Sequence, residues 1–136
     1  MRNVTVLSHA EAWQIVEAVR AELDKDGRGA AVAVCDPHGE IIALLRTDTC
    51  PLASINNAVN KAFTAAREGK ESREVGAASR SEDFPLTNFG DLRYIGWGGG
   101  VPVIVEGATV GAVGVSGLPE ADDMELARMG AALISG

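Results

Sequence analysis

The chain has 136 residues, a length that suits one compact domain and leaves little room for a second. Hydrophobic residues make up 46% of the chain, enough for a core, which argues against disorder. Twelve basic and nineteen acidic side chains give a net charge of −7, and no basic patch interrupts this balance. Because an acidic chain repels a phosphate backbone, we expect no nucleic-acid partner, and a single domain over residues 1–136.

The N-terminal residues MRNVTVLSHA lack the long apolar run of a secretory signal, and no segment is apolar enough to span a membrane. Cys35 lies within an apolar run and Cys50 precedes a proline, so the two do not form a C-x-x-C pair. His9 and His38 stand far apart and show no metal-ligand spacing. These observations predict a reduced, cytoplasmic protein with no metal site and no membrane partner.

The first third of the chain predicts a helix followed by a β-hairpin. Ser8 and Glu11 match a capping box, and apolar residues then recur at helical spacing until Gly27. Two short apolar runs, 30–35 and 41–45, flank the turn residues DPHG. Proline fixes φ and glycine accepts a positive φ, so these runs predict two antiparallel strands.

The rest of the chain predicts three more helices and a second hairpin. An apolar stripe at i, i+3, i+4 and i+7 predicts a helix over 55–66, which Gly69 ends. A short helix over 71–78 opens a less regular segment. Two strands follow within 98–117, and a last helix covers 119–134. Because hairpins pair antiparallel, we predict an α+β fold with helices covering an antiparallel sheet.

The stretch GGGVPVIVEGATVGAVGVSG, residues 98–117, raises the question whether its glycines bind a phosphate or shape a sheet. A dinucleotide loop needs G-x-G-x-x-G before a helix, but Val101 and Val103 stand where the third glycine is required. A Walker loop needs Gly-Lys-Ser/Thr, which is absent. The phosphate interpretation therefore fails. Gly111 and Gly114 instead remove side chains where a helix, a subunit or a ligand can approach the backbone.

The glycine triplet, Gly98, Gly99 and Gly100, can adopt φ values that other residues rarely adopt. The triplet therefore either lets the chain turn into the sheet or forms part of a ligand pocket. The irregular segment before them contains Tyr94 and Trp97 among its aromatic residues. Such a segment suits a lid over a small molecule or the contact of a homo-oligomer, which we then expect at or near residues 84–97. Both interpretations stay open. For the first, these five residues are the candidate ligand-binding set.

Lys61 is the sharpest candidate for chemistry, because it borders the apolar stripe of the second predicted helix. It is either a solvated lysine or a cleft group that holds a carboxylate or moves a proton. Arg46 offers a planar fork for a carboxylate, and Asp48 can accept a proton or join a surface ion pair. Since both precede the helix of Lys61, we expect the three candidate catalytic residues to converge. Asp122 and Asp123 suit the positive end of the last helix, and secondarily a pocket.

Four stretches in this order, AVAVCDPHGEIIALLRTD, NKAFTA, the glycine-rich run over 98–117, and ADD near the last helix, resemble the GlcG/HbpS-like family. That family is also found as the C-terminal domain of PduO-type proteins. The resemblance spans nearly the whole chain, and the glycine-rich run is its most specific part. One motif departs: Thr47 stands between Arg46 and Asp48 where the family usually has methionine, which changes the lining of any nearby pocket.

The resemblance implies a profilin-like sheet flanked by helices, and assembly into homo-oligomers. It also implies a small-molecule or cofactor-binding protein, accessory to a catabolic pathway. Several members are associated with haem or a corrinoid, so haem is the suggested cofactor, with neither His9 nor His38 assigned as its ligand. The alternative is a cofactor-free isomerase or lyase acting on a small oxidised carboxylate. In that case Arg46 holds the anion, while Lys61 and Asp48 move a proton.

Overall fold

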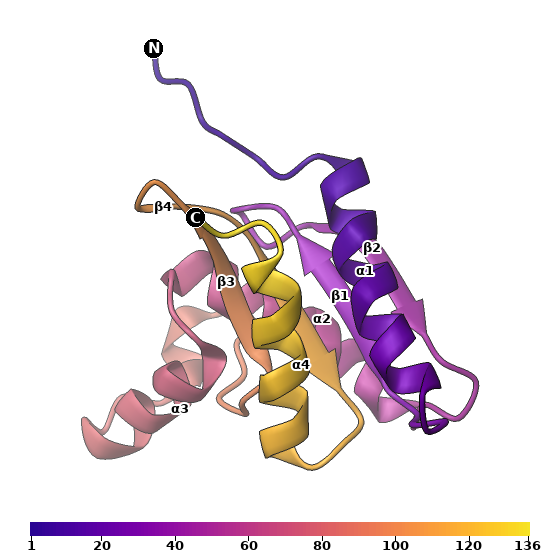
Figure 1. Ribbon diagram of the computed structural model, residues 1–136. Helices are drawn as coiled ribbons and strands as arrows, with labels where there is room; N and C mark the ends of the chain where they lie inside the picture. The colour runs from indigo at the N-terminus through magenta and orange to yellow at the C-terminus, as the bar shows by residue number, and fades with distance from the viewer.

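The computed structural model describes residues 1–136 and contains a four-stranded antiparallel sheet between two helical layers (Figure 1). In chain order the elements are α1 (His9–Asp24), β1 (Ala31–Cys35), β2 (Ile41–Arg46), α2 (Ala53–Glu68), α3 (Ser72–Ser81), the 3-10 helix η1 (Leu86–Phe89), β3 (Gly100–Val105), β4 (Ala108–Ser116) and α4 (Glu120–Ala132). The predicted α+β, profilin-like architecture is confirmed. None of the helices is both long and apolar enough to cross a bilayer.

Local sequence signals set the ends of the helices. Ser8 accepts the backbone N–H of Glu11, and the Glu11 carboxylate accepts the backbone N–H of Ser8, so the predicted capping box is present at α1. Gly69 ends α2 in the left-handed region, with φ of +65°. The capping box therefore sets the start of α1, and Gly69 sets the end of α2, as the sequence predicted.

The strands lie in the order β2-β1-β4-β3, so the two hairpins join through their inner strands. Strand β1 is buried at every position, because helices cover both of its faces. Alternation along β1 sends Val32 and Val34 to one face and Ala31, Ala33 and Cys35 to the other. The sheet therefore has a valine face and a face of small residues.

The two faces pack against their helices in different ways. Helices α1 and α4 lie side by side over the valine face, where branched side chains such as Ile15, Leu23 and Val113 form the larger core (Figure 1). Helix α2 covers the other face, where the core consists of alanines and Cys35. Small side chains let the backbone of α2 come close to the sheet, and this closeness positions the candidate site.

Two glycines of the sheet set the distance between α2 and the strands. A Cβ on Gly114 would overlap the carbonyl oxygen of Ala58, and a Cβ on Gly100 would overlap the carbonyl oxygen of Lys61. Both positions therefore need glycine to admit the helix backbone. The glycine-rich run therefore removes side chains where helix α2 packs on the sheet. A helix was one of the alternatives that the sequence analysis left open, together with a subunit or a ligand.

The packed face of α2 differs from the predicted apolar stripe. Ile55 and Val59 are only partly buried, whereas Ser54, Lys61 and Ala65 are buried. Because the backbone of α2 lies close to the strands, only small aliphatic side chains fit between the helix and the sheet. The larger aliphatic side chains therefore lie at the flank of the helix. Lys61 is 3% exposed, which excludes the solvated-lysine alternative.

Candidate functional site

A cavity of about 370 Å³ lies where the first turns of α2 and α4 meet the end of β4. Its volume falls in the range of about 300–1,000 Å³ that is typical of small-molecule sites. Only two of the lining residues are hydrophobic. The walls are formed by Ser54, Lys61, Trp97, Ser116, Gly117, Leu118, Glu120 and Asp123.

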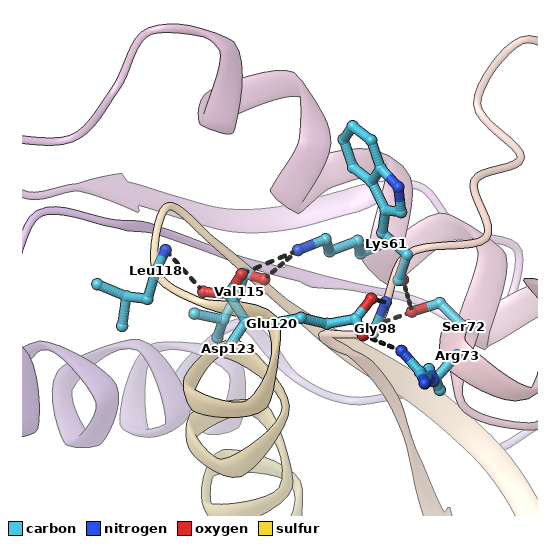
Figure 2. A network of polar contacts seen from close by, with 10 residues as sticks. Lys61, Ser72, Arg73, Gly98, Val115, Leu118, Glu120 and Asp123 are labelled. Carbon is cyan, nitrogen blue, oxygen red and sulfur yellow. Dashed lines mark hydrogen bonds and ion pairs between the residues drawn. The ribbon is translucent and has the colours of Figure 1, made fainter.

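Lys61 reaches this cavity from α2 (Figure 2). Its ammonium donates to the backbone carbonyl of Val115, with an Nζ–O distance of 3.0 Å, and to Oδ2 of Asp123, at 3.1 Å. An ammonium carries three N–H donors, so one donor at the cavity wall has no protein acceptor. That donor makes Lys61 the group best placed to bind an anion.

Gly99 makes room for the ammonium just before β3. Its φ of +124° favours glycine, and a Cβ there would lie 3.0 Å from Nζ of Lys61 and 2.5 Å from the carbonyl oxygen of Val115. The carbonyl of Gly99 accepts the backbone N–H of Val115, while the carbonyl of Val115 is left for Lys61. The middle glycine of the triplet thus opens the end of the sheet to the lysine.

Asp123 holds the other side of the ammonium from the first turn of α4. Its Oδ1 accepts the backbone N–H of Leu118 at 3.1 Å, while Oδ2 pairs with Lys61 (Figure 2). Burial raises the pKa of the Asp123 carboxyl, and the Lys61 charge and the backbone N–H groups of Leu118 and Gly117 oppose that rise. The result is a buried ion pair whose carboxylate takes up a proton more readily than an exposed aspartate.

A second polar network fixes the start of α4 against the glycine triplet. One carboxylate oxygen of Glu120 accepts the backbone N–H of Gly98 at 2.9 Å, and the other pairs with Arg73 of α3 (Figure 2). Both oxygens of this cavity-lining carboxylate therefore have partners. An incoming anion meets no unpaired negative charge at Glu120.

Ser72 ties α3 to the segment that carries Trp97. Its Oγ donates to the backbone carbonyl of Trp97 at 2.7 Å and accepts the backbone N–H of Gly100 at 2.9 Å. The Trp97 backbone is held in this way, while its side chain is 59% exposed and lines the cavity. Trp97 therefore offers a flat apolar surface at the cavity wall.

The structure does not bring the predicted trio together. Arg46 and Asp48 are exposed, form no ion pair and do not line the cavity, and the carboxylate partner of Lys61 is Asp123 rather than Asp48. The cause is the strand order. Lys61 meets the sheet at β4, and β1 lies between β4 and the edge strand β2, whose end carries Arg46.

The predicted ligand-binding residues also separate. Trp97 lines the cavity, whereas Gly98, Gly99 and Gly100 lie behind its wall and shape it through their backbones. Tyr94 lies outside this cavity. Its ring packs edge-on against the ring of Phe63, with the ring centres 5.3 Å apart. Among these residues, only the side chain of Trp97 can contact a ligand in the Lys61 cavity.

Sequence reasoning missed Ser54 and Ser116 as cavity residues and treated Asp123 mainly as a helix-terminal charge. Ser54 had a detectable signal, because a spacing of seven places it on the same helix face as Lys61. For Asp123, the only signal in the sequence was that it belongs to the ADD motif. Its pairing with Lys61 joins residues 62 positions apart, a contact that helical spacing cannot reveal.

A model of the family described as "Haem degrading protein HbpS-like" matches residues 7–132. The chain belongs to the HbpS-like family. Protein GlcG of Escherichia coli strain K12 is 35% identical to it over 119 residues, which cover 85% of each chain. A double mutant of HbpS from Streptomyces reticuli is 31% identical and superposes with a TM-score of 0.89, covering 100% of this HbpS-like chain and 92% of the other. The resemblance inferred from the sequence motifs is confirmed.

A further solved structure is the complex of PduOC with haem. It superposes with a TM-score of 0.86 at 23% identity, covering 96% of each chain, and so shows that the fold is shared. The Lys61 cavity of this HbpS-like chain does not fit a haem group. Haem iron takes His, Cys, Met or Tyr as protein ligand, and none of these lines the cavity. Its polar walls fit a smaller ligand.

Proposed function

We propose that this HbpS-like protein binds a small organic anion of the carboxylate class in the Lys61 cavity. The observation that carries the proposal is the third N–H of a buried ammonium whose other two donors are occupied by Val115 and Asp123. Hydrogen bonds between a charged donor and a carboxylate are roughly twice as strong as neutral ones, and partial burial strengthens them further.

The surroundings of the cavity support an anionic ligand. The first turns of α2 and α4 border it through Ser54 and Glu120, and helix N-termini carry partial positive charge. The carboxylates of Asp123 and Glu120 are each bonded at both oxygens, so neither repels an anion as a free charge would. Trp97 can pack against the carbon part of the ligand.

We also propose that the protein associates with haem, and that it does so outside the Lys61 cavity. The name of the matched family and the haem complex of the structural neighbour PduOC support this association. The protein would act as a homo-oligomer in the cytoplasm, accessory to a catabolic pathway. Ile41 and Leu44, exposed on the free edge strand β2, and Trp97, within the predicted contact segment 84–97, support the oligomer.

A second candidate function is a cofactor-free isomerase or lyase acting on a small oxidised carboxylate. The raised pKa of Asp123 beside Lys61 favours it, because such a carboxyl can exchange a proton with a bound substrate. Asp123 then takes the role predicted for Asp48, and no role in the cavity falls to Arg46. Incubation of the bound carboxylate in heavy water separates the two functions: deuterium in the recovered ligand indicates catalysis, and its absence indicates binding alone.

The binding proposal is tested with the fluorescence of Trp97. The chain has two tryptophans, so a Trp13→Phe background leaves Trp97 as the only reporter. We expect short mono- and dicarboxylates to change its emission in a saturable way, while the corresponding uncharged amides have no effect. Equal responses to acids and amides would contradict the proposal.

Two lysine variants in the same background give a matched comparison. Lys61→Met should reduce carboxylate affinity at least tenfold, whereas Lys25→Met, which alters an exposed lysine outside the cavity, should bind like its parent. Both are assayed at a temperature where circular dichroism shows them folded. Unchanged affinity in the Lys61 variant would refute the assignment of the site.

A further inference from the structure

Two serine hydroxyls in the Lys61 cavity have no partner in the protein. Ser54 belongs to the first turn of α2 and Ser116 is the last residue of β4, and both line the cavity. The two residues are only 7% and 5% exposed. Neither Oγ takes part in a hydrogen bond within the chain, although every polar side-chain atom that is shut off from solvent has a partner. The accessible surface of both hydroxyls therefore faces the cavity.

Formation of helix α2 does not account for the hydroxyl of Ser54. A serine near the start of a helix commonly caps a free backbone N–H, as Ser8 does at α1. At α2 the N-cap residue is Leu52, and no side chain caps the helix. Ser54 instead lies seven residues before Lys61, on the same face of the helix. Its hydroxyl is thus presented to the cavity rather than to the backbone.

Strand alternation brings Ser116 to the opposite wall of the cavity. Gly114, two residues earlier in β4, lies against the Ala58 backbone of α2, so Ser116 is on the face of the sheet that α2 covers. Ser116 also directly follows Val115, whose carbonyl accepts the Lys61 ammonium at 3.0 Å (Figure 2). Its hydroxyl is therefore offered next to the residue that holds the ammonium.

The other polar side chains of the cavity wall are already bonded. Asp123 accepts hydrogen bonds from Lys61 and from the backbone of Leu118, and Glu120 bonds Gly98 and Arg73. The polar side-chain groups left for a ligand are one N–H of the ammonium and the two serine hydroxyls. An unsubstituted carboxylate bound at the ammonium leaves a second, uncharged polar position beside it.

An oxygen on the carbon next to the carboxylate suits that second position. A serine hydroxyl has one donor and two acceptor lone pairs. The hydroxyl of a 2-hydroxy acid can donate to one serine and accept from the other, and the carbonyl of a 2-oxo acid can accept from both. Because a buried polar group without a partner costs free energy, such acids gain bonds that an unsubstituted acid lacks.

We propose that the ligand of the Lys61 cavity is a short 2-hydroxy or 2-oxo carboxylic acid, and that Ser54 and Ser116 bind the oxygen on its second carbon. The inference rests on the proposed carboxylate site and names the substrate class of that site. Lys61 then provides affinity for carboxylates in general, while the two serines select among them.

Calorimetric titration of the wild-type protein with propionate, lactate and pyruvate tests the substrate class. The three acids share a three-carbon skeleton and one carboxylate, and they differ only at the second carbon. We expect lactate, pyruvate or both to bind about tenfold more tightly than propionate, as one or two added hydrogen bonds allow. The acid with the larger gain identifies whether the site prefers a hydroxyl or a carbonyl oxygen.

Serine variants test which residues make the selection. Ser54→Ala and Ser116→Ala should each reduce the advantage over propionate, and the double variant should abolish it while the affinity for propionate stays unchanged. Ser81→Ala, which alters an exposed serine outside the cavity, should behave like wild type. Since neither cavity hydroxyl has a partner in the chain, its removal should leave the urea unfolding midpoint nearly unchanged.

The outcomes separate this inference from the proposal on which it rests. Equal affinity of wild type for all three acids would overturn the substrate class and leave carboxylate binding standing. An advantage that persists in the double variant would overturn the role of the two serines. Absence of binding for all three acids, together with the absence of any carboxylate response of Trp97, would end the carboxylate site itself.

Discussion

Lys61→Met is expected to lower the free energy of unfolding by about 3–5 kcal/mol at neutral pH, because it leaves a buried carboxylate without its cation. Both Lys61 and Asp123 are buried, so water cannot replace the lost partner of the carboxylate. Urea unfolding of wild type and variant, followed by circular dichroism, measures the difference.

The loss of stability in Lys61→Met should depend on pH in a defined direction. The pKa of Asp123 is already raised in the folded protein, and removal of Lys61 raises it further, since Lys61 is the largest influence opposing the rise. The folded variant then binds a proton that the unfolded chain releases, so its stability increases as pH falls from neutral through the folded pKa. The deficit relative to wild type should shrink on acidification. A double variant, Lys61→Met with Asp123→Asn, should lack this trend, and an equal deficit at every pH would contradict the ion-pair account.

Gly114→Ala is expected to cost about 3 kcal/mol, at the upper end of the usual range for overpacking. Its new Cβ would overlap the carbonyl oxygen of Ala58, so the backbone of α2 rather than a flexible side chain must move. Because α2 also carries Lys61, carboxylate affinity should fall together with stability. Urea unfolding and the Trp97 titration measure the two effects.

Gly107→Ala serves as the control for a glycine in open space. No atom lies near its added Cβ, and only the positive φ of +78° opposes the substitution, at a cost of about 1 kcal/mol. Carboxylate binding should be unchanged, since the residue lies in the β3–β4 turn away from the cavity. An equal loss of stability in Gly114→Ala and Gly107→Ala would contradict the proposal that Gly114 is needed for the close packing of α2 on the sheet.

Much of the fold was predictable because its signals are local. The capping box of Ser8, the DPHG turn and the stop at Gly69 each depend on residues within a few positions of one another. Glycine in the last strand also predicted a close backbone approach. The sequence did not show that α2 would be the approaching element, because the strand order that places β4 under α2 depends on pairing between distant segments.

The candidate site was predictable only in part for the same reason. Lys61 and Trp97 were identified from helical position and aromatic content, and both line the cavity. Asp123 was not chosen as the partner of Lys61, because an acidic residue in the first turn of a helix is well explained by the helix dipole alone. Asp48 was preferred because a short loop connects it to the helix of Lys61, but chain proximity did not place it across from the lysine side chain.

We infer that the buried ammonium of Lys61 binds a carboxylate, and the magnetic resonance signal of that ammonium tests this binding most directly. The chain has three lysines, and Lys25 and Lys70 are exposed. Protons of exposed ammonium groups exchange rapidly with water, so isotope-labelled lysine side chains should give one slowly exchanging signal, from Lys61. Addition of the carboxylate that saturates the Trp97 response should shift this signal and slow its exchange further, with the same midpoint as the fluorescence change. A signal that keeps its position and exchange rate through saturation would contradict the account.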